Sequence, residues 1–323
     1  NINGILECIK NQDYDHNNME VVLVDGASTD NTRALMCEFA LDNKDEFRRV
    51  VVLDNPKKTL PSGWNVALRE YKGDAIIKVD AHAVIPEDFV SKNVRVLETG
   101  EYICGGQRPN IIDKPTPFKE TLLLAESSMF GSSIASYRNN PGKTYVKSLF
   151  HAAYRREVFE KVGFFNEELV RTEDNEIHYR MRKAGYKLCF DPDIISYQYT
   201  RSSLKAMLKQ KYANGYWIGK TSKVCPKCLS IYHFVPFAFV SAIIASGSVI
   251  GATGLAECIK KRHNHTLGKG ISALRKVTVV LTTVMWVLYA LMASGMAAVS
   301  AFKAEDKRNI TNACLPVLFL LLH

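Results

Sequence analysis

The chain has 323 residues, of which 47% are hydrophobic and 23% charged, and this composition excludes a chain that is disordered over most of its length. A formal net charge of +9 favours anionic partners such as phosphates and lipid headgroups. The basic residues are dispersed, without a basic stripe interleaved with aromatic residues, so we expect no nucleic-acid partner. The 8 cysteines are scattered rather than arranged as a secreted disulfide framework, which indicates a reducing compartment.

The first 200 residues alternate helical patterns with short β-rich runs. After an opening helix, INGILECIKNQ, we predict strands at residues 20–25, 48–55 and 74–80, and helices at residues 29–43 and 62–71. This alternation predicts an α/β fold with a mostly parallel central sheet. In such sheets ligands collect at the carboxyl ends of the strands.

The first strand ends in an acid, within VVLVDGASTDNT. Asp25 terminates the strand, and the residues after it supply turn and helix-cap chemistry. A strand followed by Asp-Gly is also a common structural turn, so both interpretations stay open. The segment has no Gly-x-Gly-x-x-Gly, which argues against a dinucleotide-binding fold.

A second acid ends the third strand, in IIKVDAHAVIPEDFV. If the chain is extended there, Asp80 and His82 point the same way and can address one cation or one phosphate-bearing ligand. A carboxylate with an imidazole suits Mn²⁺ somewhat better than Mg²⁺. The alternative is that Asp80 caps a turn and His82 is an ordinary surface histidine.

A third group of acids opens a predicted helix in LVRTEDNEIHYRMRKAGYKLCFDP. Thr172 is the expected N-cap, with Glu173, Asp174 and Glu176 in the first turn. A helix N-terminus keeps a carboxylate ionised, as a general base requires. In a helix considered alone, the same acids would merely stabilise the helix.

The last hundred residues contain long apolar segments, unlike the rest of the chain. Residues 231–256 and 277–302 carry no acidic or basic charge other than a histidine, and each is long enough to span a bilayer. A third apolar segment begins at residue 313. Basic residues flank the first span on both sides, against the positive-inside tendency. Several explanations stay open. The first segment could re-enter the membrane on the same side, lie at the membrane interface, or form a helix broken at Pro236 or a nearby glycine, or the positive-inside rule could fail here.

Taken in this order, the three acidic segments around Asp25, Asp80 and Asp174 resemble those of family 2 glycosyltransferases with the GT-A fold. VVLVDGASTDNT is similar to the nucleotide-binding turn, VDAHAVIPEDFV to the Asp-x-Asp metal region, and GFFNEELVRTED to the approach to the catalytic base. Within the family the chain resembles membrane-bound enzymes of succinoglycan-type exopolysaccharide assembly. The resemblance covers residues 1–220, expected to form the catalytic domain, and continues into a membrane region, residues 221–323.

The resemblance implies a role for each matching residue. Asp25 would contact uridine, Asp80 the ribose-diphosphate and the metal, and His82 would stand where the family has its second metal acid. Asp174 would be the base and Glu173 would face the acceptor. Gln210 and Trp217 lie where processive synthases have Gln-x-x-Arg-Trp and would bind acceptor, although that motif is not intact here. The family's first strand would lie before Asn1.

These assignments imply an inverting transfer from a UDP-sugar, with glucose as the first candidate, dependent on Mn²⁺ or Mg²⁺. The acceptor would be a lipid-linked saccharide or glycan, with other polysaccharide-assembly proteins as further partners. We expect a multi-pass protein of the cell membrane with its catalytic domain in the cytoplasm. The alternative is a non-catalytic membrane module that binds sugar nucleotides.

Overall fold

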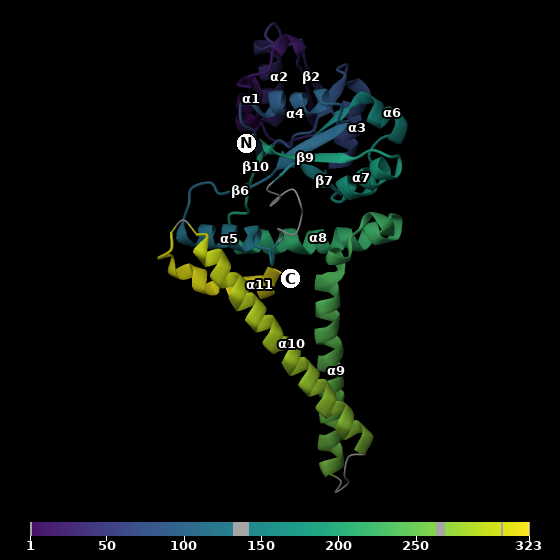
Figure 1. Ribbon diagram of the computed structural model, residues 1–323, viewed down its shortest axis with the longest axis vertical. Coiled ribbons are helices and arrows are strands. Elements are labelled where there is room, and N and C mark those ends of the chain that lie inside the picture. The colour runs from purple at the N-terminus through teal and green to yellow at the C-terminus, as the bar shows by residue number, and fades with distance from the viewer. Residues whose placement is uncertain (1, 132–141, 263–268, 305, 323) are drawn as a thin grey trace. The chain divides into compact units, whose positions relative to one another are not determined.

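The computed structural model describes residues 2–131, 142–262, 269–304 and 306–322. It forms two compact units, Asn1–Leu229 and Ser230–His323 (Figure 1). The boundary predicted at residue 220 falls inside a helix that continues to Val224, so the first unit is slightly longer than the catalytic domain expected from sequence. The division of function between the two units stays a prediction.

The described residues of the first unit form both helices and strands. In chain order these are α1 Ile2–Lys10, β1 Glu20–Asp25, α2 Thr32–Asp42, β2 Arg49–Asp54, α3 Leu60–Glu70, β3 Ala75–Ile77, β4 Ala83–Val84, α4 Phe89–Glu98, β5 Ile103–Gln107, β6 Asn110–Ile111, α5 Pro117–Ser127, β7 Thr144–Val146, β8 Ala152–Arg155, α6 Arg156–Val162, α7 Glu173–Lys183, β9 Leu188–Ile195, β10 Tyr197–Tyr199 and α8 Leu204–Val224. The strand predicted at residues 74–80 ends at Ile77, three residues early.

The sheets are mixed, and the prediction of a mostly parallel sheet is wrong. β1 and β2 pair in parallel, whereas the five-stranded sheet has the order β3-β8-β5-β9-β7. Its β5–β9 pair is parallel, but β8 runs antiparallel to both β3 and β5, and β7 runs antiparallel to β9. The four-residue β8 is too short for its direction to be read from hydrophobic periodicity, and it lies between β3 and β5.

Two buried clusters hold this unit together. One joins Ile5 and Leu6 of α1 to β1 and to Phe89 of α4. The other packs Tyr154 of β8 against α6 and α7, where Ile177 is fully buried. The alternation of buried residues along β1 is the pattern expected of a strand with one face on the core. These clusters fix the strand ends that carry the acids.

An apolar slot separates β1 from β3. Each of these strands pairs on its other side, β1 with β2 and β3 with β8. A cavity of about 1200 Å³ lies along their facing edges, and its lining includes Val21 and Leu23 of β1 and Ile76 of β3. Asp25 and Asp80 therefore do not end strands that pair with each other. The additional family strand expected before Asn1 stays a prediction.

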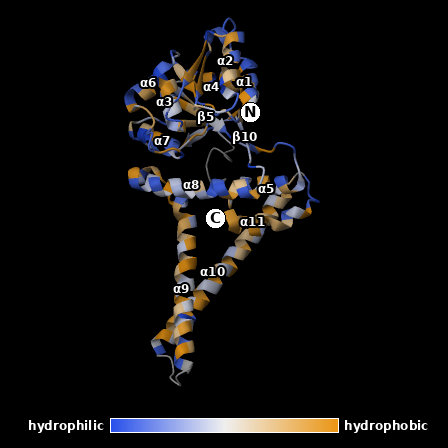
Figure 2. Cartoon of the chain, turned by 180° about the vertical axis from the view of Figure 1, so that it is seen from behind, coloured by the Kyte–Doolittle hydropathy of each residue, from blue (hydrophilic) through white to orange (hydrophobic). Residues whose placement is uncertain are grey.

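The second unit contains two long apolar helices, α9 Val235–Arg262 and α10 Lys269–Phe302, followed by α11 Leu315–Leu322. Figure 2 shows hydrophobic residues along both long helices. By length and composition, segments Ile231–Lys260 and Lys269–Phe302 could each cross a membrane, and at most 6% of their apolar windows is buried, unlike a soluble core helix. α9 is continuous, so the broken-helix alternative is wrong. Part of the basic loop, residues 263–268, lies outside the described residues.

Candidate active site

Asp80 opens a tight turn just beyond β3. The Ala83 N–H donates to the Asp80 carbonyl at 3.0 Å, so the strand-like geometry assumed for Asp80 and His82 is replaced by a turn. The Asp80 main-chain N–H donates to His151 Nε2 at 3.3 Å, and the Asp80 carboxylate lies 3.7 Å from the same nitrogen. His151 immediately precedes β8. The turn thus places the Asp80 side chain beside the residue that leads into β8, an interior strand of the five-stranded sheet.

The imidazole of His151 is neutral at pH 7. Its side chain is 1% exposed, and burial lowers its pKa. Because Nε2 accepts the Asp80 N–H, Nδ1 carries the hydrogen and donates to Ser196 Oγ at 2.8 Å. Ser196 follows β9. His151 therefore supports Asp80 as a hydrogen-bond acceptor and not as a fixed positive charge.

Asp80 and His82 fit the role of partial ligands for a divalent cation. Asp80 Oδ1 is buried, and among the described residues it has no hydrogen-bond partner. His82 is exposed on the same turn, with Nε2 3.3 Å from Gln198 Nε2. The described part of the chain holds no group of three His, Cys, Asp or Glu residues suited to a metal. This small ligand set fits a cation that takes its remaining ligands from a phosphorylated substrate and water.

Asp174 lies in the first turn of α7 and forms a buried ion pair with Lys78, the residue after β3. Lys78 Nζ donates to Asp174 Oδ1 at 2.5 Å, and the two side chains are 6% and 19% exposed. Burial raises the pKa of Asp174, while the positive charge of Lys78 opposes that rise. The charge of Asp80 also acts on Asp174, so these acids share one electrostatic site.

Glu173, the neighbouring acid, has a different environment. It is 3% exposed, and its Oε2 is buried without a hydrogen-bond partner among the described residues. Burial, and then the charge of Asp174, raises the pKa of Glu173 to about 8. At neutral pH Glu173 therefore holds a proton, and a protonated carboxyl group can donate a hydrogen bond.

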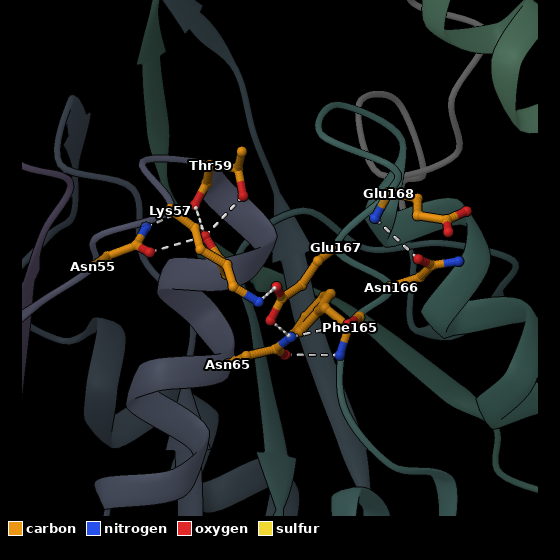
Figure 3. Close-up of polar contacts among 9 residues, drawn as sticks. Asn55, Lys57, Thr59, Asn65, Phe165, Asn166, Glu167 and Glu168 are labelled. Atoms are coloured by element: carbon orange, nitrogen blue, oxygen red, sulfur yellow. Dashed lines mark hydrogen bonds and ion pairs between the residues drawn. The ribbon is translucent and has the colours of Figure 1, made fainter.

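The loop before α7 is clamped to α3 (Figure 3). The Asn65 side chain accepts from the Phe165 N–H and donates to the Phe165 carbonyl, both at 2.9 Å. Asn65 Nδ2 also donates to Glu167 Oε1 at 2.9 Å, and Lys57 Nζ reaches Glu167 Oε2 at 2.6 Å. Arg180 adds a tie from within α7, because it donates to the Phe164 carbonyl at 2.7 Å. These contacts fix where α7, and with it Asp174, begins.

Thr172 is the N-cap residue of α7, as expected, but its side chain does not cap the helix. Its φ of −125° and ψ of 18° do not have the extended geometry in which a cap hydroxyl reaches the first-turn N–H groups. Instead its hydroxyl bonds that of Thr221 on α8. This contact docks the start of α7 against the helix that carries Gln210 and Trp217.

Gln210 and Trp217 are less closely tied to the acids. Trp217 is half-buried, and its carbonyl accepts from Thr221 Oγ1 at 2.8 Å. The same Thr221 hydroxyl contacts Thr172. Gln210 is half-exposed, and among the described residues no hydrogen bond joins it to Glu173 or Asp174. Their predicted acceptor contacts stay predictions.

Asp25 lies at the end of β1, opposite Asp54 at the end of β2. It is 2% exposed, and its carboxylate accepts from the Ser28 N–H at 3.1 Å. Ala27, in the turn between them, has a φ of 56°. The carboxylate therefore stabilises its own turn, as the structural interpretation expects, while contact with uridine stays a prediction.

Lys78 and His151 also belong to this site and were not predicted from the sequence. A lysine between apolar residues in AIIKVDA is a recognisable signal, because a strand interior rarely holds an unpaired charge. His151 gives no comparable local signal, since only the antiparallel insertion of β8 brings it to Asp80.

Comparison with known proteins identifies the family. Residues 1–163 match the model of glycosyl transferase family 2. The chain belongs to this family. The resemblance of its three acidic segments predicted this family.

Two curated relatives act in glycan assembly by their names. The succinoglycan biosynthesis protein ExoA of Rhizobium meliloti (strain 1021) is 30% identical over 203 residues, which cover 61% of this chain and 59% of that protein. The dolichyl N-acetyl-alpha-D-glucosaminyl phosphate 3-beta-D-2,3-diacetamido-2,3-dideoxy-beta-D-glucuronosyltransferase of Methanococcus voltae is 26% identical over 251 residues, covering 75% of this chain and 76% of that enzyme. The chain thus spans less than two thirds of the length of ExoA.

A solved structure shares the fold. The mannosyltransferase PcManGT from Pyrobaculum calidifontis, in complex with GDP-Man and Mn²⁺, superposes with a TM-score of 0.54 at 17% identity. The match covers 99% of this chain and 81% of that one. The chain therefore has the GT-A glycosyltransferase fold that the sequence predicted, built on a mixed sheet.

Proposed function

We propose that the protein is an inverting glycosyltransferase that moves a sugar from a UDP-sugar to a lipid-linked saccharide or glycan at the cell membrane. The observation that carries this proposal is the buried ion pair of Asp174 with Lys78, two residues before Asp80, whose Oδ1 is buried without a hydrogen-bond partner among the described residues. Glucose is the first candidate for the transferred sugar, by resemblance to succinoglycan-type enzymes.

The donor is proposed to bind at the polar end of the cavity between β1 and β3. The residues at that end, which follow β1, β2 and β3 in the chain, are Gly26, Asn55, Lys58, Asp80 and His82. Main-chain N–H groups and a lysine are suitable partners for a diphosphate. The related fold of PcManGT, solved with GDP-Man and Mn²⁺, supports a nucleotide-sugar donor and leaves the base to be tested.

The proposed donor site also includes a divalent cation. Asp80 and His82 would hold Mn²⁺ or Mg²⁺, whose charge would stabilise the diphosphate as it leaves. His151 keeps Asp80 in place by accepting its main-chain N–H. The positioning of the Asp80 carboxylate is thus provided by the fold before any ligand binds.

Asp174 is proposed to be the general base. Its carboxylate takes the proton from the acceptor hydroxyl as that oxygen bonds to the anomeric carbon. The bond from the anomeric carbon to the phosphate oxygen breaks, and its electron pair leaves with UDP. Attack from the face opposite UDP inverts the anomeric centre. Glu173, beside the base, is proposed to donate a hydrogen bond to the acceptor.

The membrane brings the enzyme to its acceptor. α9 and α10 are proposed to cross the bilayer, which makes the protein multi-pass, and residues 1–229 are placed in the cytoplasm, where nucleotide sugars are made. A lipid-linked acceptor is then met at the membrane surface. The name of the Methanococcus voltae enzyme, which includes a dolichyl phosphate substrate, supports a lipid-linked acceptor, and the name of ExoA supports a role in polysaccharide synthesis.

The experiment incubates the full-length protein in lipid nanodiscs with UDP- and GDP-sugars and Mn²⁺, with and without a polyprenyl-diphosphate saccharide. The proposal expects transfer from a UDP-sugar that requires both the cation and the acceptor. A non-catalytic module would bind nucleotide and transfer nothing. Transfer from GDP-sugars alone would contradict the assignment of uridine.

A further inference from the structure

Lys78 is a buried cation inside the active site. Its side chain is 6% exposed, and its main-chain N–H donates to the Ala152 carbonyl at 2.9 Å, which extends the β3–β8 pairing past Ile77. The ammonium lies 5.2 Å from the ring centroid of Trp64 and 5.7 Å from that of Phe165. Aromatic faces attract a cation, but burial of an ammonium still requires a hydrogen-bonded anion.

Of the two acids at the start of α7, Lys78 contacts Asp174. The ammonium donates to Asp174 Oδ1 at 2.5 Å, whereas Glu173 Oε2 is buried without a hydrogen-bond partner among the described residues. A charge-assisted hydrogen bond of this kind favours the ionised form of its acceptor. Burial works against ionisation at both acids, but the lysine opposes it chiefly at Asp174.

The position of the lysine is as informative as its charge. Lys78 lies two residues before Asp80 on the same chain segment, so one segment supplies both the donor-site carboxylate and the partner of the base. Its rigid β3–β8 attachment faces an α7 whose start is held by the Asn65 clamp. The distance between the lysine and Asp174 is thus fixed from both sides.

We propose that Lys78 is a positioning residue that selects Asp174, and not Glu173, as the carboxylate that accepts the acceptor proton. This inference rests on the proposed function. Lys78 orients Asp174 through Oδ1 and keeps its own proton throughout the reaction. The Asp174 side chain remains 19% exposed, which leaves part of it accessible to an acceptor hydroxyl.

The test is a double-mutant cycle in the full-length enzyme with Lys78→Met, Asp174→Asn and the combined variant. Lys78→Met keeps the aliphatic length and removes the charge. We expect it to lower kcat by about 10- to 100-fold, with the donor KM within about threefold of wild type. Because Lys78 acts through Asp174, the combined variant should be no slower than Asp174→Asn. Lys72→Met, at an exposed lysine nearby, is the matched control.

The outcomes separate this inference from the proposed function. If Asp174→Asn abolishes transfer while Lys78→Met retains a kcat within threefold of wild type, Asp174 remains the base and the role of Lys78 is rejected. Losses that multiply in the combined variant also reject it, because they show independent action. Full activity of Asp174→Asn rejects the base itself.

A folding defect of Lys78→Met is also informative. Loss of the lysine alone would leave a buried carboxylate without its partner, whereas the combined variant removes both charges. Circular dichroism and UDP binding should then show that Lys78→Met/Asp174→Asn regains the fold that Lys78→Met lacks. A combined variant as unfolded as the single one would contradict the pairing.

Discussion

Asn65 exchanges two hydrogen bonds with the main chain of Phe165, a hundred residues further along the sequence. The pair joins α3 to the loop that leads into α7, and both groups are buried. A side-chain amide is one of the few groups that can satisfy a main-chain N–H and a carbonyl together. The position of Asp174 therefore depends on a residue that never touches it.

Replacing Asn65 with alanine should destabilise the first unit and slow transfer. The change leaves the Phe165 N–H and carbonyl buried without partners, which we expect to cost about 2–4 kcal/mol of unfolding free energy. Urea titration measures that loss. Lys57→Ala, which removes only the 69% exposed partner of Glu167, should cost less than about 1 kcal/mol. Equal losses in the two variants would contradict the clamp.

The stability of the metal-free protein should depend on Glu173. Its folded pKa of about 8 lies above the ordinary value of 4.5, so the folded state holds a proton that the unfolded state releases between these values. The resulting stabilisation is present below pH 4.5 and is lost as the pH rises through 8.

Glu173→Gln cannot ionise and should be free of this loss. Between pH 5.5 and 8.5 in EDTA, we expect the wild-type Tm to fall relative to the variant by about 3 °C or more. Differential scanning calorimetry measures the difference. Glu168→Gln, at an exposed acid on the preceding loop, is the control, and its Tm should change between the two pH values as that of the wild type does. Parallel curves for wild type and Glu173→Gln would show that Glu173 titrates normally.

Binding of UDP should require a divalent cation. Asp80→Asn removes the charge of the proposed ligand, so UDP affinity in Mn²⁺ should fall at least about tenfold, toward the value in EDTA. Asp193→Asn, at an exposed acid on β9, should bind UDP normally. Isothermal titration that gives equal UDP affinity with EDTA and with Mn²⁺ would overturn the assignment of Asp80 and His82.

Membranes that contain the protein should retain it through an alkaline carbonate wash. The two long apolar helices have almost no buried surface within the chain, so the bilayer is expected to cover them. Release into the supernatant would contradict attachment by spanning helices. Labelling of the exposed Cys258 with an impermeant maleimide from each face would then give the orientation of α9.

The sequence indicated candidate acids for the site, whose roles stay predictions, but it did not predict the arrangement of the sheet. Asp80 and Asp174 were recognisable because acids after apolar runs and at a helix start have few structural uses in combination. The direction of β8 was not readable, because four residues carry no signal of which neighbours they will pair with. His151 reaches Asp80 only through that pairing.

The hydrogen-bond and ion-pair partners of side chains could not be predicted from local sequence patterns either. Thr172 stands at the N-cap that its residue type favours, yet the helix α8 offers its hydroxyl a partner in Thr221. Tertiary contact thus replaced a local hydrogen bond. Lys78 was visible as a charge in an apolar run, but its choice between Glu173 and Asp174 required the three-dimensional arrangement.

The central claim, that Asp174 is the general base, is tested most directly by the turnover of Asp174→Asn in the full-length enzyme. The amide keeps the size of the side chain and removes its basicity, so kcat should fall by about 10² to 10⁴ while UDP-sugar binding stays near normal. If Asp174→Asn transferred sugar within a few fold of wild type, while Glu173→Gln or Glu176→Gln abolished transfer, Asp174 would not be the base.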